Sequence, residues 1–163
     1  MRKPSSLRDA LVAALPELQR DPEKLSMFIK SGRVINTGTK SLSWEYRYTL
    51  SVLILDYAGH PDAIMAPLLL WARRYQSELF HNHELRDRAI RFDADFLSAT
   101  TVDLAVEIDL TEPVIARARP DTPGALNLTH PEEPPHPAMV LQAEHWELFI
   151  KDEKVAEWNF EPL

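Results

Sequence analysis

Hydrophobic residues recur at helical spacing in two stretches of the chain. The first stretch begins near Ser5 or Ser6, either of which is a fitting N-cap, and ends or bends where Pro16 interrupts the pattern. A second helix is predicted over residues 61–80, in which Pro67 marks a kink or the first turn. The apolar stripes are Leu7, Leu11, Leu15 and Leu18 in the first helix, and Ile64, Leu68, Trp71 and Tyr75 in the second.

Alternation of apolar and polar residues predicts three strands, over residues 43–57, 90–96 and 102–110. A looser pattern over residues 27–34 predicts a fourth strand. Such alternation puts one face of a sheet on a core and the other in water, which is typical of antiparallel sheets. In the strand over 90–96, the face expected on the core carries Ile90, Phe92, Ala94 and Phe96, and the opposite face carries Arg91, Asp93 and Asp95.

The pattern changes at Arg119. Six of the 13 prolines fall between Pro120 and Pro137, which predicts an extended, semi-rigid spacer. Beyond it, two short apolar segments around the polar residues 151–154 predict a terminal β-hairpin. The chain is therefore predicted to contain an α+β core domain over 1–118, a proline-rich spacer over 119–143 and a C-terminal β-hairpin arm over 144–163.

These elements together predict an α+β fold in which two helices pack on one face of a mostly antiparallel sheet. A two-stranded hairpin is marginal alone in water, so the terminal arm must dock on its own sheet or on another subunit. Its large aromatic residues are expected to anchor an interface, with packing in the core of the same chain as the alternative. The predicted interface residues are Trp146, Phe149 and Trp158 of the arm, and Arg73 and Arg74 on the polar side of the second helix.

Composition excludes several classes of protein. A chain of 163 residues with 45% hydrophobic residues is typical of one globular domain, and its net charge of -7 disfavours a sequence-independent nucleic-acid binder. Without cysteine there is no disulfide, thiolate metal site or cysteine nucleophile. The longest apolar run, 64–72, is shorter than the ~20 residues that span a bilayer. Asp9 interrupts any signal-peptide core at the N-terminus.

The charge is unevenly distributed along the chain. Residues 1–100 hold 14 Lys and Arg against 12 Asp and Glu, whereas residues 101–163 hold 4 against 13. Ordinary surface variation accounts for this split as readily as function does. The functional interpretation is that an acidic part of one subunit meets a basic part of the next, as a head-to-tail ring requires.

Few residues suggest catalysis or metal binding. His81 and His83 form a close pair, but side chains two apart on a helix diverge, which favours a polar loop over a metal site. The strand carboxylates alternate with core residues, which favours a solvated sheet face over acid–base catalysis. No nucleophile elbow or glycine-rich phosphate loop occurs in the sequence. We therefore predict no catalytic residue, no metal and no cofactor. Two alternatives remain open: a small enzyme acting through exposed carboxylates, and a monomeric adaptor whose proline spacer is itself a ligand.

An ordered set of motifs points to a family. In sequence order the set is Leu42, Ser43, Trp44, Glu45, Arg47, Tyr48, Thr49 and Leu50; then Asp56, Tyr57, Gly59 and Asp62; then Pro67, Leu69, Trp71 and Arg73. The chain also starts with KPSSLRDAL, and a proline-rich stretch precedes residues 147–150 and Trp158. With these features, the chain resembles the tail completion protein R family of Peduovirus-type contractile-tailed phages. The resemblance spans nearly the whole chain, although residues 89–118 match only in pattern.

The resemblance implies a structural role and no enzymatic activity. Members are expected to form a ring, by analogy a hexamer, at the head-proximal end of the virion tail after synthesis in the host cytoplasm. The ring would stop polymerisation of the tail tube and sheath and prepare the tail to join the neck and head. The expected partners are thus copies of the chain itself, tube and sheath proteins, and neck or head-completion proteins, with no specific nucleic-acid or membrane binding.

Two hypotheses about surfaces follow. If the terminal hairpin lies on a neighbouring subunit or on the sheath, deleting residues 138–163 should leave a folded core that cannot assemble. If the acidic face of the sheet lines the channel of the ring, negative charge there would keep passing DNA from sticking. The predicted channel-facing residues are Asp103, Glu107 and Asp109.

Overall fold

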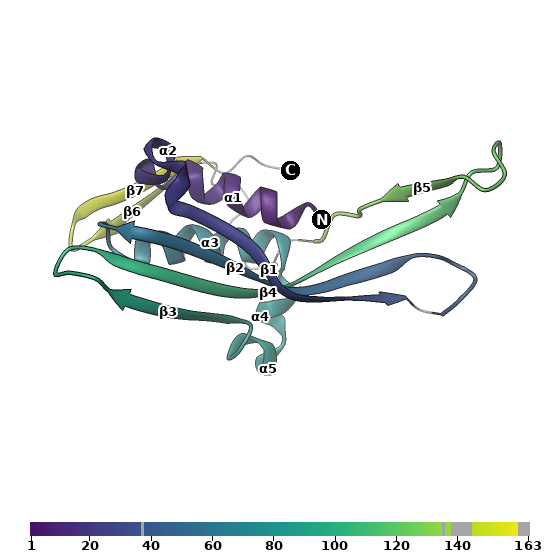
Figure 1. Cartoon of the computed structure of the whole chain (residues 1–163), viewed down its shortest axis with the longest axis horizontal. Helices are drawn as coiled ribbons and strands as arrows, with labels where there is room; N and C mark the ends of the chain where they lie inside the picture. Colours follow the sequence, from purple (N-terminus) through teal and green to yellow (C-terminus); the bar gives the residue numbers. More distant parts are fainter. Residues whose placement is uncertain (37, 135, 138–144, 160–163) are drawn as a thin grey trace.

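Helices lie against one face of a long antiparallel sheet in the computed structural model of the chain (Figure 1). The structure describes residues 1–36, 38–134, 136–137 and 145–159. The predicted α+β class is confirmed. Among the described residues, no helix is both long and apolar enough to cross a bilayer.

The main sheet has four antiparallel strands in the order β1-β2-β4-β3, so β1 and β3 form its two edges. The strands are β1 (Leu25–Asn36), β2 (Trp44–Tyr57), β3 (Ile90–Phe96) and β4 (Val102–Ala118). A fifth strand, β5 (Leu126–Thr129), pairs with the far end of β4. Alternate residues of β4 are buried from Val102 to Ala116, which defines the core face of the sheet.

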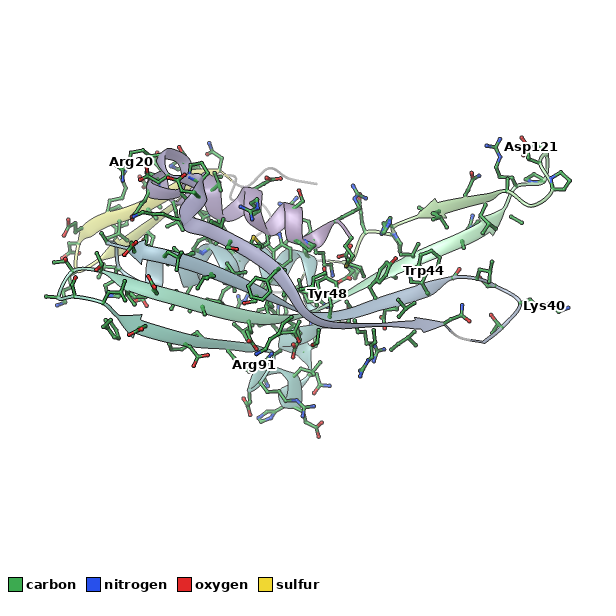
Figure 2. All side chains as sticks on the ribbon, in the orientation of Figure 1. Arg20, Lys40, Trp44, Tyr48, Arg91 and Asp121 are labelled. Carbon is green, nitrogen blue, oxygen red and sulfur yellow. The ribbon has the colours of Figure 1, made fainter. Side chains whose placement is uncertain are left out.

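The sheet extends beyond the body of the molecule as two long hairpins at one end (Figure 1). We define arm 1 as residues 31–36 and 38–47, and arm 2 as residues 114–129. Figure 2 places Lys40 at the tip of arm 1 and Asp121 at the tip of arm 2. Because β4 is 17 residues long, one continuous strand serves both the body and arm 2. Arm 1 begins at a bulge in β1, where the register with β2 shifts between Ile29 and Ser31.

Two helices, α1 (Lys3–Ala14) and α3 (Asp62–Tyr75), form the layer over the core face. Both predicted stripes lie in or against the core, and Tyr75 is the member that stays half-buried. The fully buried Trp71 donates its indole N–H to Ser6 Oγ over 3.0 Å, which joins α3 to α1. The predicted helix over 61–80 is in fact two helices. The short helices are α2 (Pro16–Arg20), the 3-10 helix η1 (Pro22–Lys24), α4 (Glu78–His81) and α5 (His83–Arg86).

The terminal hairpin consists of β6 (His145–Ile150) and β7 (Glu153–Asn159). Its two turn residues, Lys151 and Asp152, both have positive φ (48° and 65°), as a two-residue hairpin turn with the twist of its strands requires. β7 contacts α1, and Ala156 and Trp158 are buried in the same core as the helices. In the structure, therefore, the hairpin docks on its own chain.

Three sequence-based expectations need correction. Phe92 and Phe96, predicted on the core, are 63% and 74% exposed, because β3 is an edge strand with a neighbour on one side only. The strand predicted to end at residue 110 continues to Ala118. The predicted spacer over 119–143 contains β5, and its residues 130–134, 136 and 137 pass along the body, where the His136 N–H donates to the Arg73 carbonyl oxygen over 2.9 Å. The spacer residues 135 and 138–143 lie outside the described residues.

Candidate assembly surfaces

Many of the exposed large hydrophobic side chains lie on the two arms. They are Val34 and Leu42 on arm 1, and Leu126 and Leu128 on arm 2. Strand pairing fixes their direction: Val34 lies opposite Tyr46 and Leu128 opposite Ala116, so both point to the side of the sheet that forms the core in the body. Beyond the body this side is uncovered. Hydrophobic side chains exposed together on projecting strands are typical of surfaces that contact another macromolecule.

The arms are basic, although the whole chain is acidic. Arm 1 contains Arg33, Lys40, Arg47 and Glu45, and arm 2 contains Arg117, Arg119 and Asp121, so the arms carry a net charge of +3. Two of these cations pair within their own arm, Arg47 with Glu45 and Arg119 with Asp121. Since those pairs are neutral, the charge that the arms present to a partner comes from the other three basic residues.

The β3 edge surface, residues 92–104, has the opposite charge. It contains Asp93, Asp95 and Asp103 and no lysine or arginine. The exposed side chains of Phe92 and Phe96 alternate with those of Asp93 and Asp95 along β3. Because β3 pairs with β4 alone in the described sheet, its outer backbone groups are open to another strand.

The outer face of the sheet, opposite the core, is less acidic than its sequence indicates. Lys30 Nζ lies 2.5 Å from Glu107 Oε1, and the Arg91 guanidinium lies 3.0 Å from Asp109 and 3.4 Å from Glu107. The hydrogen bond from Lys30 is the main cause that lowers the pKa of Glu107. Asp103 accepts a backbone N–H of β2 over 2.8 Å. A channel-facing role for Asp103, Glu107 and Asp109 stays a prediction, with part of their charge neutralised by these partners.

Replacing Arg91 with methionine should raise the pKa of Asp109. Burial alone raises that pKa, but hydrogen bonds from Arg91 and Thr49 outweigh it and hold the pKa below 3.8. The stability linked to this depressed pKa is present above the unfolded value and lost as pH falls through the folded one. Because the pair is partly exposed, we expect a loss of about 1 kcal/mol or less at neutral pH. NMR titration of the Asp109 carboxyl measures the shift directly.

Arg88→Met is the matched control for this prediction, since Arg88 acts on Asp109 by charge alone and more weakly. It should shift the pKa of Asp109 less than Arg91→Met does. An Asp109 pKa that is equal in Arg91→Met and in the wild type would mean that the ion pair does not form in solution.

A buried polar cluster holds residues 130–134, 136 and 137, which we call the strap, against the body. Lys3 Nζ donates to Gln76 Oε1 and Glu133 Oε1 over 2.6 Å each, and to the Thr111 carbonyl oxygen over 2.7 Å. Ser77 Oγ donates to the carbonyl of residue 134 over 2.9 Å. Burial lowers the pKa of Lys3 and raises the pKa of Glu133. The hydrogen bond between them opposes both shifts, because it stabilises the charged form of each side chain. The cluster thus fixes the chain where it leaves arm 2.

The two predicted interface tryptophans face their own chain. Trp158 is 4% exposed within the core, and the partly buried Trp146 packs against that core. The expectation that these side chains anchor a neighbouring subunit therefore needs correction, because the same chain already covers them. Phe149 of the same hairpin is 54% exposed, and it remains a predicted interface residue.

The two predicted interface arginines differ in exposure. Arg74 is buried, with its guanidinium carbon 5.5 Å from the centre of the Tyr75 ring. The Arg73 guanidinium carbon lies 5.6 Å from the centre of the Phe80 ring, on the polar side of α3 where the sequence placed it. The helix pattern places Arg74 on the same polar side as Arg73, but packing in the folded chain buries it. Arg73 remains a predicted interface residue.

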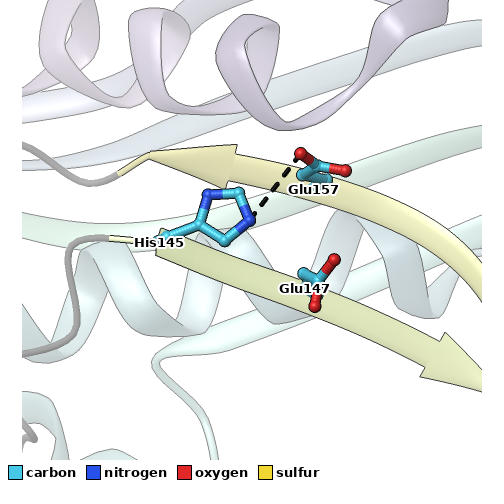
Figure 3. A group of neighbouring side chains, drawn as sticks. All are labelled: His145, Glu147 and Glu157. Atoms are coloured by element: carbon cyan, nitrogen blue, oxygen red, sulfur yellow. Dashed lines mark ion pairs between the residues drawn. The ribbon is translucent and has the colours of Figure 1, made fainter.

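One exposed group on the terminal hairpin has the residue types of a metal site: His145, Glu147 and Glu157 (Figure 3). Lys154 already supplies a cation there, because its ammonium donates to both glutamates. The His145 ring also pairs with Asn159 Oδ1 over 2.8 Å. These contacts explain why the three side chains lie close together without a bound metal ion.

The histidine pair considered in the sequence is split between two short helices. His81 ends α4 and His83 begins α5, and the His81 ring stacks on His136 of the strap at 4.6 Å between ring centres. Asn82 between them accepts the Glu84 backbone N–H and so caps α5. The pair thus lies at the junction of two short helices, where the sequence favours a polar loop.

The surface formed by the described residues includes two hollows. A groove of 1080 Å³ lies between the base of arm 1 and helices α4 and α5, and its lining includes Arg33, Arg47 and Glu78. A smaller hollow of 480 Å³ lies between the N-terminus and the strap. Asp93 and Asp95, the carboxylates on which an enzymatic interpretation depended, line neither of them.

Sequence reasoning missed the buried polar cluster and its neighbour Glu112. Glu112 is 3% exposed and accepts hydrogen bonds from the Tyr48 hydroxyl and, over 2.6 Å, from the Arg2 backbone N–H. The alternation of β4 did indicate that Glu112 is buried. Leu110 and Val114, two residues away on either side, are apolar and buried, so Glu112 lies on the same core face. A charged residue on a core face predicts a buried polar partner.

Comparison with known proteins identifies relatives of the whole chain. A family model described as P2 phage tail completion protein R matches residues 1–134. The tail completion protein R of Escherichia phage P2 is 34% identical over 159 residues, which cover 98% of this chain and 99% of that protein. No solved structure matches.

Proposed function

The chain belongs to the P2 phage tail completion protein R family, and we propose that it completes the tail as a ring at the head-proximal end. In this proposal the ring, a hexamer by analogy with other long-tailed phages, stops growth of the tube and sheath. It also presents the surface that joins the neck and head. Its partners are copies of the chain, tube and sheath proteins, and neck proteins.

One structural observation carries the proposal: the sheet ends in two different open edges, β1 and β3, and projects two arms beyond one end of the body (Figure 1). An open edge is a template for pairing with another chain. Two unlike edges allow each copy to contact its neighbour through different surfaces, which is the contact type that closes into a ring. To stop growth of the tube and sheath, the ring must also have one side to which no further tube or sheath subunit can bind.

The structural details favour assembly over the two alternatives. An enzyme acting through Asp93 and Asp95 would need a concave site around them, and these residues lie on an exposed edge strand. An adaptor that offers its proline segment as a ligand would need that segment to be free to lie along a partner. Within the described residues the strap is instead held on the body by Lys3, Ser77 and Arg73, although Pro131, Pro134 and Pro137 are exposed.

Loss of the chain should abolish tail completion. In cells that assemble tails of this type without it, we expect tubes of irregular length and tails that do not join heads, seen by electron microscopy. Expression of the chain in the same cells should restore uniform tails. A tag inserted in the exposed turn at Lys151 and Asp152 should appear at the head-proximal end of each tail. Uniform tails joined to heads in cells that lack the chain would refute the proposal.

A further inference from the structure

We propose that the open edge of β1 in arm 1, residues 31–36, pairs with the open edge of β3 in the next copy of the chain. This inference rests on the proposed ring and identifies the two surfaces that meet in it. It is carried by three observations on the molecule: two unpaired edges of similar length, matching alternation of side chains, and opposite charge.

Both edges are free to pair in the described part of the chain. Residues 31–36 of β1 hydrogen-bond to β2 on one side, and β3 (Ile90–Phe96) hydrogen-bonds to β4 on one side. The bulge before Ser31 separates this part of β1 from the part next to the body. Each edge therefore offers about six residues of unpaired backbone, the usual length of a strand in a sheet.

Side chains on the two edges match on both faces. On the core side of the sheet, arm 1 presents Val34, which is 61% exposed, and β3 presents Phe92 and Phe96. On the outer side, Arg33 lies opposite Arg47 in the sheet, and β3 presents Asp93 and Asp95. One continuous sheet across two copies would thus bring apolar residues together on one face and opposite charges together on the other.

Charge makes the match selective for unlike edges. The arms carry a net charge of +3, and the β3 edge surface carries -3. The cation next to it on β3, Arg91, is paired with Glu107 and Asp109 of the same sheet. Two copies of β3 facing each other would bring like charges together, which is unfavourable, and so would two copies of arm 1. Contact between arm 1 and β3 avoids both.

The two surfaces also lie in different parts of the molecule. The arms project from one end of the body, and β3 runs away from them along the opposite part of the sheet (Figure 1). A copy bound through its arm therefore leaves its own β3 edge open for the next copy. Such a head-to-tail contact can be repeated until the ring closes.

β5 is the competing edge on the arms. It exposes Leu126 and Leu128, and it has no charged residue between Leu126 and Thr129. Pairing through β5 would therefore leave Asp93 and Asp95 without a facing cation on the edge strand itself. This is why we assign the contact to β1.

Cysteine cross-linking tests the assignment, because the natural chain has no cysteine. Val34→Cys is combined in turn with Phe92→Cys, Ala94→Cys and Phe96→Cys, and each full-length variant is treated with a short bis-maleimide, both purified and in assembled tails. We expect at least one combination to give a ladder of covalent multimers. Each single variant should stay uncross-linked, because unlike edges meet. Circular dichroism confirms that each variant is folded.

Matched pairs decide among the other outcomes. Phe96→Cys with Leu69→Cys, an exposed position on α3, should give no ladder. Cross-linked multimers of the single variant Val34→Cys would overturn the assignment to β1 and β3. Cross-links between Leu128→Cys on β5 and a cysteine on β3, tested in the same way, would overturn it as well. Multimers that form without any of these links would overturn it and leave the ring proposal standing. Absence of multimers both in solution and in tails would instead refute the ring.

Charge reversal gives an independent readout. Arg33→Glu should weaken self-association about fivefold, and Phe96→Asp tenfold or more, since a partly exposed charge pair contributes less than a buried aromatic ring. Adding Asp93→Lys and Asp95→Lys to Arg33→Glu should restore association, measured by sedimentation. Arg20→Glu, at the far end of the body (Figure 2), is the control that should have no effect. Failure of the double reversal to restore association would contradict the charge match.

Discussion

Trp158→Ala should lower the free energy of unfolding by about 3–5 kcal/mol, the usual cost of removing a large aromatic side chain from a core. Trp158 is 4% exposed and belongs to the same core cluster as Leu7 and Leu11 of α1. Its loss would leave a cavity between the terminal hairpin and that helix. Urea denaturation followed by circular dichroism measures the change.

Two variants serve as controls for Trp158→Ala. Trp158→Phe should cost much less, because it keeps most of the apolar ring and removes a buried indole N–H that has no partner among the described residues. Phe149→Ala, in the same hairpin but 54% exposed, should change stability little. If Trp158→Ala unfolds at the same urea concentration as the wild type, the hairpin is not docked on its own chain in solution.

The docked hairpin changes what truncation is expected to do. From the sequence, removal of residues 138–163 should spare the core and prevent assembly. In the structure this deletion also removes Ala156 and Trp158, which are core residues. Loss of assembly in the truncated chain would therefore be caused by loss of folding. Point changes on exposed residues, such as Phe96 and Val34, separate the two effects.

Lys3→Met should destabilise the fold by about 3–5 kcal/mol at neutral pH, the range expected when one partner of a buried ion pair is removed. Lys3 is the cation at the centre of the cluster, and Glu133, Glu112 and Glu78 all act on it. Without it, these carboxylates lose their shared partner, and Gln76 loses the donor to its side-chain oxygen. Urea denaturation at neutral pH provides the measurement.

The pH dependence of this variant gives a second test. Burial already raises the pKa of Glu133 above 4.5 in the wild type, and removal of Lys3 takes away the main opposing effect. A group with a raised folded pKa stabilises the fold below its unfolded pKa, and this stability is lost as pH rises through the folded value. The deficit of Lys3→Met should therefore shrink as pH falls from neutral towards 4.5. In Lys3→Met with Glu133→Gln, the deficit should depend less on pH. A deficit that grows on acidification would contradict the described cluster.

Local patterns were sufficient to predict most elements of the fold. The leucine stripe from Leu7 to Leu18 and the alternation in β2 follow from residue order alone, since each element must bury one face. The exposure of Phe92 and Phe96 does not follow from order, because it depends on which strand lies at the edge of the sheet. The same applies to Arg74, which tertiary packing buries.

The candidate surfaces were less predictable than the fold. The sequence showed a charge split between residues 1–100 and 101–163, but the basic arms and the acidic β3 edge do not follow it. Arm 2 belongs to the acidic part of the sequence, and Asp93 and Asp95 belong to the other part. The arms themselves could not be foreseen, because β2 and β4 carry their alternation from the body into the arms without a break. The docking site of the hairpin tryptophans could not be predicted either. An amphipathic strand can pack on the core of its own chain or on that of a neighbouring chain.

The length of β4 has a mechanical consequence. β4 runs from the body into arm 2 without interruption, and β2 does the same for arm 1. We therefore expect the arms to be rigid extensions of the body rather than flexible linkers. In a ring built through such extensions, the angle at which each leaves its subunit fixes the curvature, and through it the number of copies that close the circle. The bulge at Lys30, where β1 bends, is then the place where a one-residue deletion would alter the symmetry of the ring.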